Sequence, residues 1–367
     1  MYDAPPDFLA VHADASADLT GLNSASHQTA CRAVHGATSC KGVMASEAVR
    51  LNQRAFGVFA IWDPDGDFGT CVVAKGHDPE AASSAATSRA IDAAGRPGEA
   101  PDLIWLSTSP GNEEAVLAGI MDVVGPDVPI VGGSCADNDL SGGWAVFDGE
   151  QVIGEGIAVS VLFPSGNVSV SFQNGYAPTD KSGVVTEGAG RHIAKIDDKP
   201  AAEFCVDWGG ARAREIDETV TILSDSTFAP LGRQVTDVAD VPFFLLIHPA
   251  SAHPDGSIEV FADISEGETL HQMTGSVDTL INRASRVARN ATEALPTGNE
   301  VVGALMVYCG GCMLAVEDRM DEVVAGVNQS LGGAPFLGIF TFGEQGTDFR
   351  RENHHGNLMI SCITFAA

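Results

Sequence analysis

The sequence predicts an α/β fold with mixed sheets, built from repeated strand-helix-strand-hairpin units and divided into two interlocking domains. Two segments that begin ninety-five residues apart, at Asp7 and Asp102, each open with Pro-Asp and an apolar run. The same spacing separates VHGATSC, which ends at Cys40, from VPIVGGSC, which ends at Cys135. A third, looser version, APFLGIFTFGE, occupies residues 334–344. One structural unit is therefore expected to occur three times.

The first unit spans about residues 7–75. An apolar run at 7–13 predicts a strand, and the polar segment 14–32 has room for a short helix before a Gly turn at 36–42. Apolar runs at 56–62 and 70–75 flank Asp-Pro-Asp-Gly, which predicts a hairpin. The Ala-rich segment 81–94 ends at a glycine and predicts a helix.

The second unit, about residues 102–163, repeats this order. We expect a buried strand at 103–108, a helix at 113–124 with two glutamates in its first turn, and a strand at 130–134. A hairpin of 144–148 with 153–163 follows. Helix-linked strands followed by hairpins indicate mixed sheets rather than purely parallel ones.

A clustering of Gly, Pro and polar residues near 164–166, and again at 176–183, predicts the domain boundary. We place it at 165/166, which gives domains of 1–165 and 166–367. The second domain is expected to contain two short strands within 184–197, a short helix from 199, strands at 243–248, 258–264, 305–308 and 358–365, and helices at 277–294 and 317–331.

Composition excludes several classes of function. Asp and Glu number 49 against 20 Lys and Arg, a net charge of −29, which repels phosphate backbones and disfavours nucleic acid. There is no apolar run of the roughly 20 residues that a membrane helix needs. The N-terminus lacks the pattern of a secretory signal, so the cytoplasm is the expected location. Eight cysteines in 367 residues do not make a disulfide scaffold.

Several segments in order along the chain resemble the FIST family of bacterial sensory proteins. The N-terminal part of that family is indicated by VHGATSCKG at 34–42, VPIVGGSCADND at 128–139 and FDGEQVIGEGIAVSVL at 147–162. The C-terminal part is indicated by residues 174–204, 264–273 and 336–346, followed by His354 and His355. Where relatives often have Cys, Gly and Arg after a late strand, this chain has Cys309-Gly310-Gly311-Cys312.

The resemblance implies a stand-alone small-molecule sensor rather than an enzyme. Its ligand would be amino-acid-like or haem, the latter in relatives that respond to nitric oxide. Its partner would be a separate signalling protein such as a histidine kinase, a cyclic-nucleotide enzyme or a chemotaxis protein.

Turns at strand ends expose backbone N–H groups that can hold a carboxylate or phosphate. We therefore expect the three Gly turns to line one pocket, although a glycine can equally serve only to make a left-handed turn. The candidate ligand-binding residues are Thr38, Ser39, Cys40, Gly132, Gly133, Ser134, Cys135, Asp137, Asn138, Gly343, Glu344 and His355.

Two other functions stay open at this point. A haem-binding sensor would need an axial His, for which His35 and His355 are best placed and His192 and His271 are alternatives; no CxxCH is present, so only non-covalent haem applies. A thiol enzyme would use Cys135 with a distant His. Cys309 and Cys312 have the CxxC spacing of redox or zinc sites, but a single pair supplies only half of a structural zinc site. No metal ligands are otherwise assigned.

Overall fold

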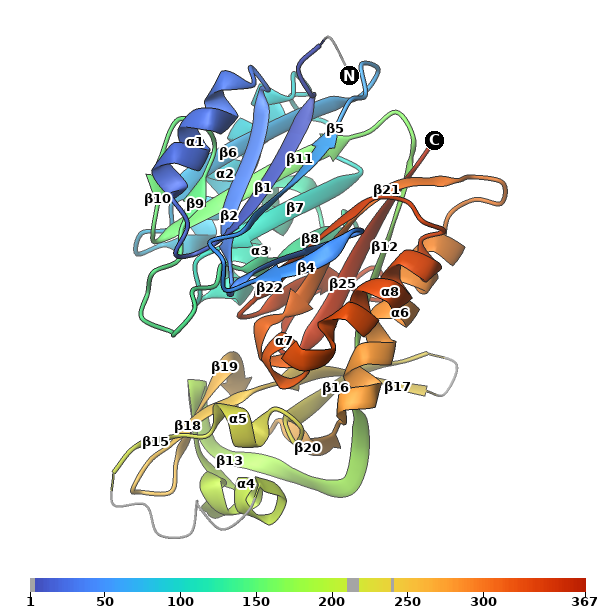
Figure 1. Cartoon of the computed structure of the whole chain (residues 1–367). Helices are drawn as coiled ribbons and strands as arrows, with labels where there is room; N and C mark the ends of the chain where they lie inside the picture. Colours follow the sequence, from blue (N-terminus) through green and yellow to red (C-terminus); the bar gives the residue numbers. More distant parts are fainter. Residues whose placement is uncertain (1–3, 210–217, 239–240) are drawn as a thin grey trace.

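The structure is a computed structural model that describes residues 4–209, 218–238 and 241–367. Two bodies are visible in Figure 1. The main body, residues 4–174 and 277–367, holds three mixed sheets and most of the helices. The small body, residues 177–274, hangs below it and consists of one strongly bent sheet with two short helices. The predicted α/β class with mixed sheets is confirmed.

Three strand-helix-strand units form the centre of the main body. The first is β1 (Phe8–Asp14), α1 (Leu19–Gln28) and β2 (Ala33–Ser39), and the second is β7 (Leu103–Thr108), α3 (Glu113–Val124) and β8 (Ile130–Ser134). In the third, β21 (Val301–Cys309) and β22 (Phe336–Thr341) are joined through α7 (Gly310–Ala315), a 3₁₀ turn at Glu317–Arg319 and α8 (Met320–Ser330). Each unit forms a parallel pair of strands.

The three parallel pairs are extended in the same way. An antiparallel strand lies on the far side of the first strand of each pair: β5 (Phe56–Ile61) on β1, β11 (Gly156–Phe163) on β7, and β25 (Met359–Ala366) on β21. The third copy therefore matches the first two not only in its parallel pair but also in this antiparallel neighbour.

The sheets interlock because the strand that follows each unit joins a different sheet. After β2 the chain enters β3 (Gly42–Ala45), which pairs with β22; after β8 it enters β9 (Val146–Phe147), which pairs with β2; after β22 it enters β23 (Glu344–Thr347), which pairs with β8. Short strands complete these edges: β4 (Ala48–Leu51), β10 (Val152–Ile153) and β24 (Asn353–Gly356). Each unit thus supplies an edge strand to another unit in a cyclic order.

This exchange corrects the hairpin predictions. The chain reverses at residues 63–66, but β5 pairs with β1 whereas β6 (Asp67–Ala74) pairs with β11 of the next unit. In the same way β9 pairs with β10 across the turn at 148–151, while β11 belongs to another sheet and β12 (Asn167–Asn174) pairs with β25. The turn residues therefore predicted correctly that the chain reverses. They did not predict which strand each arm of the reversal pairs with.

The three sheets share one core. Phe8 and Ala10 from the first unit, Leu103 and Trp105 from the second, and Leu305, Val307, Leu337 and Ile339 from the third all belong to one cluster of buried side chains. Burying each such side chain contributes roughly 1.5–3 kcal/mol. The packing of all three units against each other therefore stabilises their mutual arrangement.

The remaining predicted helices form with small changes at their ends. They are α2 (Pro79–Ala93), α4 (Ala201–Gly209) and α6 (Val277–Glu293), the last with a capping box between Ser276 and Thr279. The predicted position of the first Gly turn, residues 36–42, is wrong. Gly36 lies inside β2, where a Cβ would meet the Phe147 ring at 2.2 Å, and the turn comes later, at Lys41 and Gly42.

Residues 184–197 are not two strands but part of one long strand, β13 (Ala177–Ile196), with an irregularity at Gly190. Around it the small body is completed by α5 (Leu223–Ser226) and by β14 (Lys199–Pro200), β15 (Val220–Thr221), β16 (Leu231–Val238), β17 (Val241–Ile247), β18 (Pro249–Ala252), β19 (Ile258–Ser265) and β20 (Thr269–Thr274). Within the described residues, the helices are all too short or too polar to cross a bilayer.

Candidate functional site

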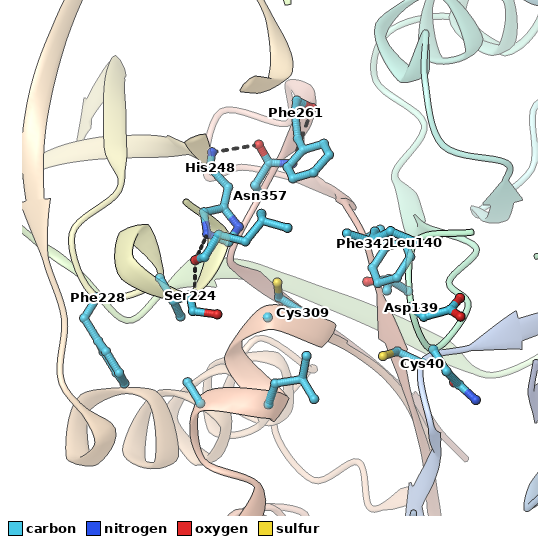
Figure 2. Close-up of a pocket in the computed structure, with 17 residues that line it drawn as sticks. Cys40, Asp139, Leu140, Ser224, Phe228, His248, Phe261, Cys309, Phe342 and Asn357 are labelled. Atoms are coloured by element: carbon cyan, nitrogen blue, oxygen red, sulfur yellow. Dashed lines mark hydrogen bonds between the residues drawn. The ribbon is translucent and has the colours of Figure 1, made fainter. Parts of the chain in front are cut away.

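A cavity of about 360 Å³ lies where the two bodies meet, in the size range of sites for small organic molecules (Figure 2). Its walls are Cys40, Asn138, Asp139, Leu140, Leu223, Ser224, Thr227, Phe228, His248, Phe261, Cys309, Gly311, Leu314, Ala315, Thr341, Phe342 and Asn357. Aliphatic and aromatic side chains predominate. Among the described residues, the lining contains one carboxylate, that of Asp139, and neither Arg nor Lys.

The main-body wall is built at the carboxyl ends of parallel strands, the usual position of ligand sites in α/β proteins. Cys309 and Thr341 are the last residues of β21 and β22 and lie opposite each other in register. Cys40 directly follows β2, and its backbone N–H donates to the Phe340 carbonyl at 2.9 Å. The sheet exchange therefore brings ends of the first and third units to one place.

A loop from the second unit closes this wall. The Asp137 carboxylate accepts four backbone N–H groups, those of residues 139, 140, 142 and 143. Asn138 donates to the Asp14 carboxylate at 2.9 Å and accepts the Lys41 N–H at 2.6 Å, which ties the loop to the first unit. Asp137 thus shapes the loop that carries Asn138, Asp139 and Leu140 to the cavity.

The opposite wall comes from the small body and from Asn357, the residue that follows β24. Figure 2 shows His248, Ser224 and Phe228 across the cavity from Leu140, Phe342 and Cys40. His248 Nε2 donates to the Leu223 carbonyl at 3.1 Å, which makes Nδ1 the acceptor of the neutral ring. Burial lowers the pKa of His248 to about 4, so the ring is neutral at pH 7. The backbone N–H of His248 donates to the side-chain oxygen of Asn357 at 3.1 Å, which joins this wall to the main body.

The structure brings the three predicted turns together, but only two of the predicted residues line the cavity, Cys40 and Asn138. Thr38 and Ser39 are buried in the crossover: Thr38 accepts the Ala145 N–H, and Ser39 Oγ accepts the Phe340 N–H at 2.8 Å. Cys135 is also buried, and its N–H donates to the Thr108 carbonyl at 2.8 Å.

The predicted glycines serve close packing rather than a left-handed turn. Gly132 and Gly133 lie within β8, where a Cβ on Gly132 would meet the Leu106 carbonyl oxygen at 1.9 Å and one on Gly133 the Thr341 side chain at 2.3 Å. A Cβ on Gly343 would meet the His355 ring at 2.5 Å. Gly133 and Gly343 lie where strands of different units approach each other, whereas Gly132 packs against β7 of its own unit.

Ser134, Glu344 and His355 belong to a buried polar network beside the cavity. Ser134 donates to Glu113 at 2.7 Å, and Glu344 accepts Thr341 Oγ1 at 2.7 Å and the Met359 N–H at 2.9 Å. Burial raises the pKa of Glu344 well above its usual value. For Glu113 burial acts in the same direction, but His355, Arg191 and hydrogen bonds outweigh it and lower the pKa to about 2.

The two histidines that were best placed by sequence as axial ligands are not available for haem iron. His35, the first proposed axial ligand, is fully buried with Nδ1 2.8 Å from Ser160 Oγ and Nε2 2.9 Å from Ser107 Oγ. His355 has Nδ1 3.1 Å from Gln345 Nε2 and Nε2 3.1 Å from the Phe261 carbonyl. Neither ring has a nitrogen left for iron, and the described part of the cavity wall offers no Arg or Lys for the propionates. His192 and His271 lie outside the cavity lining.

The thiols are protonated rather than nucleophilic. Burial raises the pKa of Cys135 and of Cys40 to about 12, and it raises that of Cys309 well above its usual value. The expected nucleophile, Cys135, therefore lacks both access and ionisation. Cys309 and Cys312 lie between a strand and a helix, as their spacing predicts; Cys309 lines the cavity, while Cys312 is buried 3.7 Å from the Tyr176 hydroxyl.

Sequence reasoning missed most of the small-body wall. Part of that wall lies on or directly after α5, a helix of four residues with no strong motif: Leu223, Ser224, Thr227 and Phe228. His248 follows an ordinary buried strand. The only signal near them was the apolar run at 243–248. Cys309 and Phe342 could have been predicted to line the cavity, because they end or follow strands of the third unit.

The geometry therefore defines an α/β protein with three interlocked strand-helix-strand units and a cavity at their junction with a smaller β-rich body. The FIST N domain matches residues 7–199 and the FIST C domain matches residues 201–347. The chain belongs to the FIST family, as the sequence resemblance indicated. FIST domains are associated with sensory signal transduction. The two matches meet at residues 199 and 201, and the boundary that we placed at 165/166 stays a prediction.

None of the curated proteins compared with the chain matches it. Among solved structures, PurLQS from Thermotoga maritima is similar at 8% identity over 83% of this chain and 73% of that one, with a TM-score of 0.24. A similarity at that level carries no argument about fold or function.

Proposed function

We propose that this protein is a cytoplasmic sensor that binds a small molecule in the cavity between its two bodies and signals to a separate protein. The partner is of the histidine kinase, cyclic-nucleotide enzyme or chemotaxis class, and the protein acts by binding rather than by catalysis. The observation that carries the proposal is the cavity itself, whose walls come from both bodies. A ligand that contacts both walls favours one arrangement of the bodies over others.

The lining indicates the chemistry of the ligand. Phe228, Phe261 and Phe342 offer an apolar surface, while Ser224 Oγ, the Asp139 carboxylate and His248 Nδ1 can accept hydrogen bonds. Because the described lining residues include Asp139 but no Arg or Lys, they favour a neutral or positively charged end over a carboxylate. We expect an amine with an apolar body, or an amino acid whose ammonium group approaches Asp139 and whose carboxylate stays toward solvent.

Native mass spectrometry of freshly purified protein tests for a retained molecule. Thermal shift with a panel of apolar amines and amino acids then identifies ligands, because a ligand at one hundred times its Kd adds about 2.7 kcal/mol of stability. Asp139→Asn should weaken binding of a charged amine about tenfold, or about 1.4 kcal/mol, and leave a neutral analogue unaffected.

Matched variants decide whether the cavity is the site. Ala315→Phe and Leu314→Trp fill the space and should abolish the shift, whereas Asp92→Asn, on the exposed face of α2, should not change it. The melting temperature of each variant without ligand reports its folding. Unchanged ligand binding by both cavity-filling variants would rule out this site.

A further inference from the structure

The small body carries a cluster of three side chains that is separate from the cavity and that the proposed function does not use. We infer that His192, His253 and Glu259 form a binding site for a divalent transition-metal ion of the zinc class. One ligand atom from each residue lies within 4.8 Å of the other two. Two imidazoles and one carboxylate are the donor set of open zinc sites, in which the fourth position holds water or another ligand.

Three neighbouring strands supply the three residues. His192 on β13 lies directly opposite Glu259 on β19, and His253 follows the end of β18, the next strand in the sheet. Ile258 and Val260, on either side of Glu259, point to the other face and are buried in the core of the small body. The strand alternation therefore places Glu259 on the face opposite that core.

The backbone holds His253 at the start of a tight turn. The His253 N–H donates to the Ser257 carbonyl at 2.9 Å, and the Gly256 N–H donates to the His253 carbonyl at 2.9 Å. Asp255 closes the turn by accepting the Ser257 N–H at 3.0 Å and its hydroxyl at 2.6 Å. The three side chains thus stand on a paired sheet and a closed turn, which fixes their spacing.

Two of the three separations between ligand atoms are close to those around a tetrahedral ion. His192 Nδ1 is 3.1 Å and His253 Nε2 is 3.7 Å from Glu259 Oε1. Ligand bonds of about 2.0–2.1 Å in a tetrahedron place neighbouring donors about 3.3 Å apart. Both separations lie within about 0.4 Å of that spacing. The third separation, between the two imidazole nitrogens, is at most 4.8 Å.

The state of His253 points independently to a missing partner. Its Nε2 is buried and has no hydrogen-bond partner among the described residues. Its other nitrogen, Nδ1, lies 3.0 Å from Thr219 Oγ1. A hydrogen bond of this kind to the second nitrogen orients metal-bound histidines, and losing it typically reduces metal affinity 10- to 100-fold.

The cluster is open on one side. The side chains of His192 and Glu259 are 43% and 42% exposed and that of His253 is 25% exposed, which leaves access for an ion and for a further ligand. On the same strand, Phe261 follows Glu259 by two residues and lines the cavity. A bound ion would therefore join β13, β18 and β19 next to the small-body wall.

In two other groups of His and carboxylates, other donors already occupy the carboxylates. In the group of Glu113, Glu114 and His355, the Arg191 guanidinium already contacts both carboxylates. In the group of Asp348, Glu352 and His354, the Asp348 carboxylate already accepts two backbone N–H groups of its own loop, those of residues 350 and 352.

Titration of untagged, chelator-treated protein with Zn²⁺ against a chromophoric chelator tests the site. We expect one ion per chain, and Co²⁺ in its place should give the strong visible absorption of a tetrahedral complex. Glu259→Gln and His253→Gln should weaken Zn²⁺ binding more than about 100-fold, and Thr219→Val about 10-fold, by comparison with the effect of orienting partners.

The control is His77→Gln, which removes an exposed histidine elsewhere and should leave affinity unchanged. Zn²⁺ should raise the melting temperature of the wild type and of His77→Gln but not that of Glu259→Gln. The metal-free melting temperatures show that each variant folds. Equal Zn²⁺ affinity in wild type and Glu259→Gln, or binding at several sites without tetrahedral Co²⁺ spectra, would overturn the inference.

Discussion

Two buried glutamates of the crossover region have opposite protonation behaviour because their neighbours differ. Burial raises the pKa of Glu113, but His355 and Arg191 outweigh it and lower the pKa to about 2. Hydrogen bonds from Ser134 Oγ and the Gly111 N–H act in the same direction as these two side chains. Glu344 has hydrogen-bond donors but no cation in contact, and burial raises its pKa well above the usual value. One side chain is therefore an ion of the folded state and the other a neutral acid.

Glu344→Gln should be neutral or stabilising at pH 7 because an amide reproduces the protonated carboxyl. Since the pKa of Glu344 is higher in the folded than in the unfolded state, its contribution to stability is full below about pH 4.3 and is lost as the pH rises. The variant should lack this loss, which amounts to at most about 1.4 kcal/mol per pH unit. Urea unfolding between pH 4 and 9 measures it, and parallel curves for wild type and variant would contradict the assignment.

At this scale the sequence identified which residues meet but not what they do. The alignment of Ser39 with Ser134 located the crossovers correctly, yet both hydroxyls are consumed by internal hydrogen bonds. The exposure of a side chain depends on which strands pack over it. Those strands can be far away in the sequence, as Phe340 is from Ser39. The wall formed by Leu223, Phe228 and His248 was unpredictable for the same reason.

Among the elements, the strands leaving each unit decide the architecture. β3, β9 and β23 each pair in another unit's sheet, and small residues at the crossing points permit the close approach. Close approach is also required inside a unit: an ideal Cβ on Gly132 of β8 would lie 1.9 Å from the Leu106 carbonyl oxygen of β7, which is backbone and cannot rotate away.

Gly132→Ala should therefore destabilise the protein by about 3 kcal/mol, at the upper end of the usual cost of overpacking. Gly154→Ala is the matched control, since a Cβ there meets only the Trp144 carbonyl at 3.6 Å. Chemical denaturation of both variants gives the comparison. A loss below about 0.5 kcal/mol for Gly132→Ala would show that the strands can separate at little cost.

The sequence predicted most elements and the threefold repetition of the unit, because apolar periodicity and helix caps are local signals. It did not predict strand partners. Turn residues at 63–66 correctly indicated a reversal, but pairing of β5 with β1 and of β6 with β11 depends on which sheet edges are free. That choice is made by the assembled core rather than by the turn.

At the scale of the whole molecule, Arg191 forms a charged link between the two bodies. It extends from β13 of the small body to Glu113 and Glu114 on α3, the latter at 3.2 Å, and also contacts Asp263 at 3.3 Å. Glu113 is 3% exposed in its side chain, so loss of Arg191 would remove a cation from a buried carboxylate and leave it only His355 and its hydrogen bonds.

Arg191→Met should lower stability by about 3 kcal/mol at pH 7. The pKa of Glu113 is depressed in the folded state, so its contribution is present above about pH 4.5 and is lost as the pH falls toward 2. The difference between wild type and variant should therefore shrink between pH 7 and pH 3. Lys195→Met, which breaks an exposed pair with Glu187 on the same strand, serves as control and should not change the melting temperature. Equal melting temperatures for wild type and Arg191→Met at pH 7 would contradict this role.

By itself the sequence determined the α/β class, the repeated unit, the family and the acidic charge, because these follow from local patterns and composition. Only the tertiary structure decided which strands share a sheet, which side chains reach the cavity and which carboxyls are charged. Those properties depend on burial and on contacts between residues far apart in the chain. A residue's neighbours in space, and not its neighbours in sequence, set its exposure and its pKa.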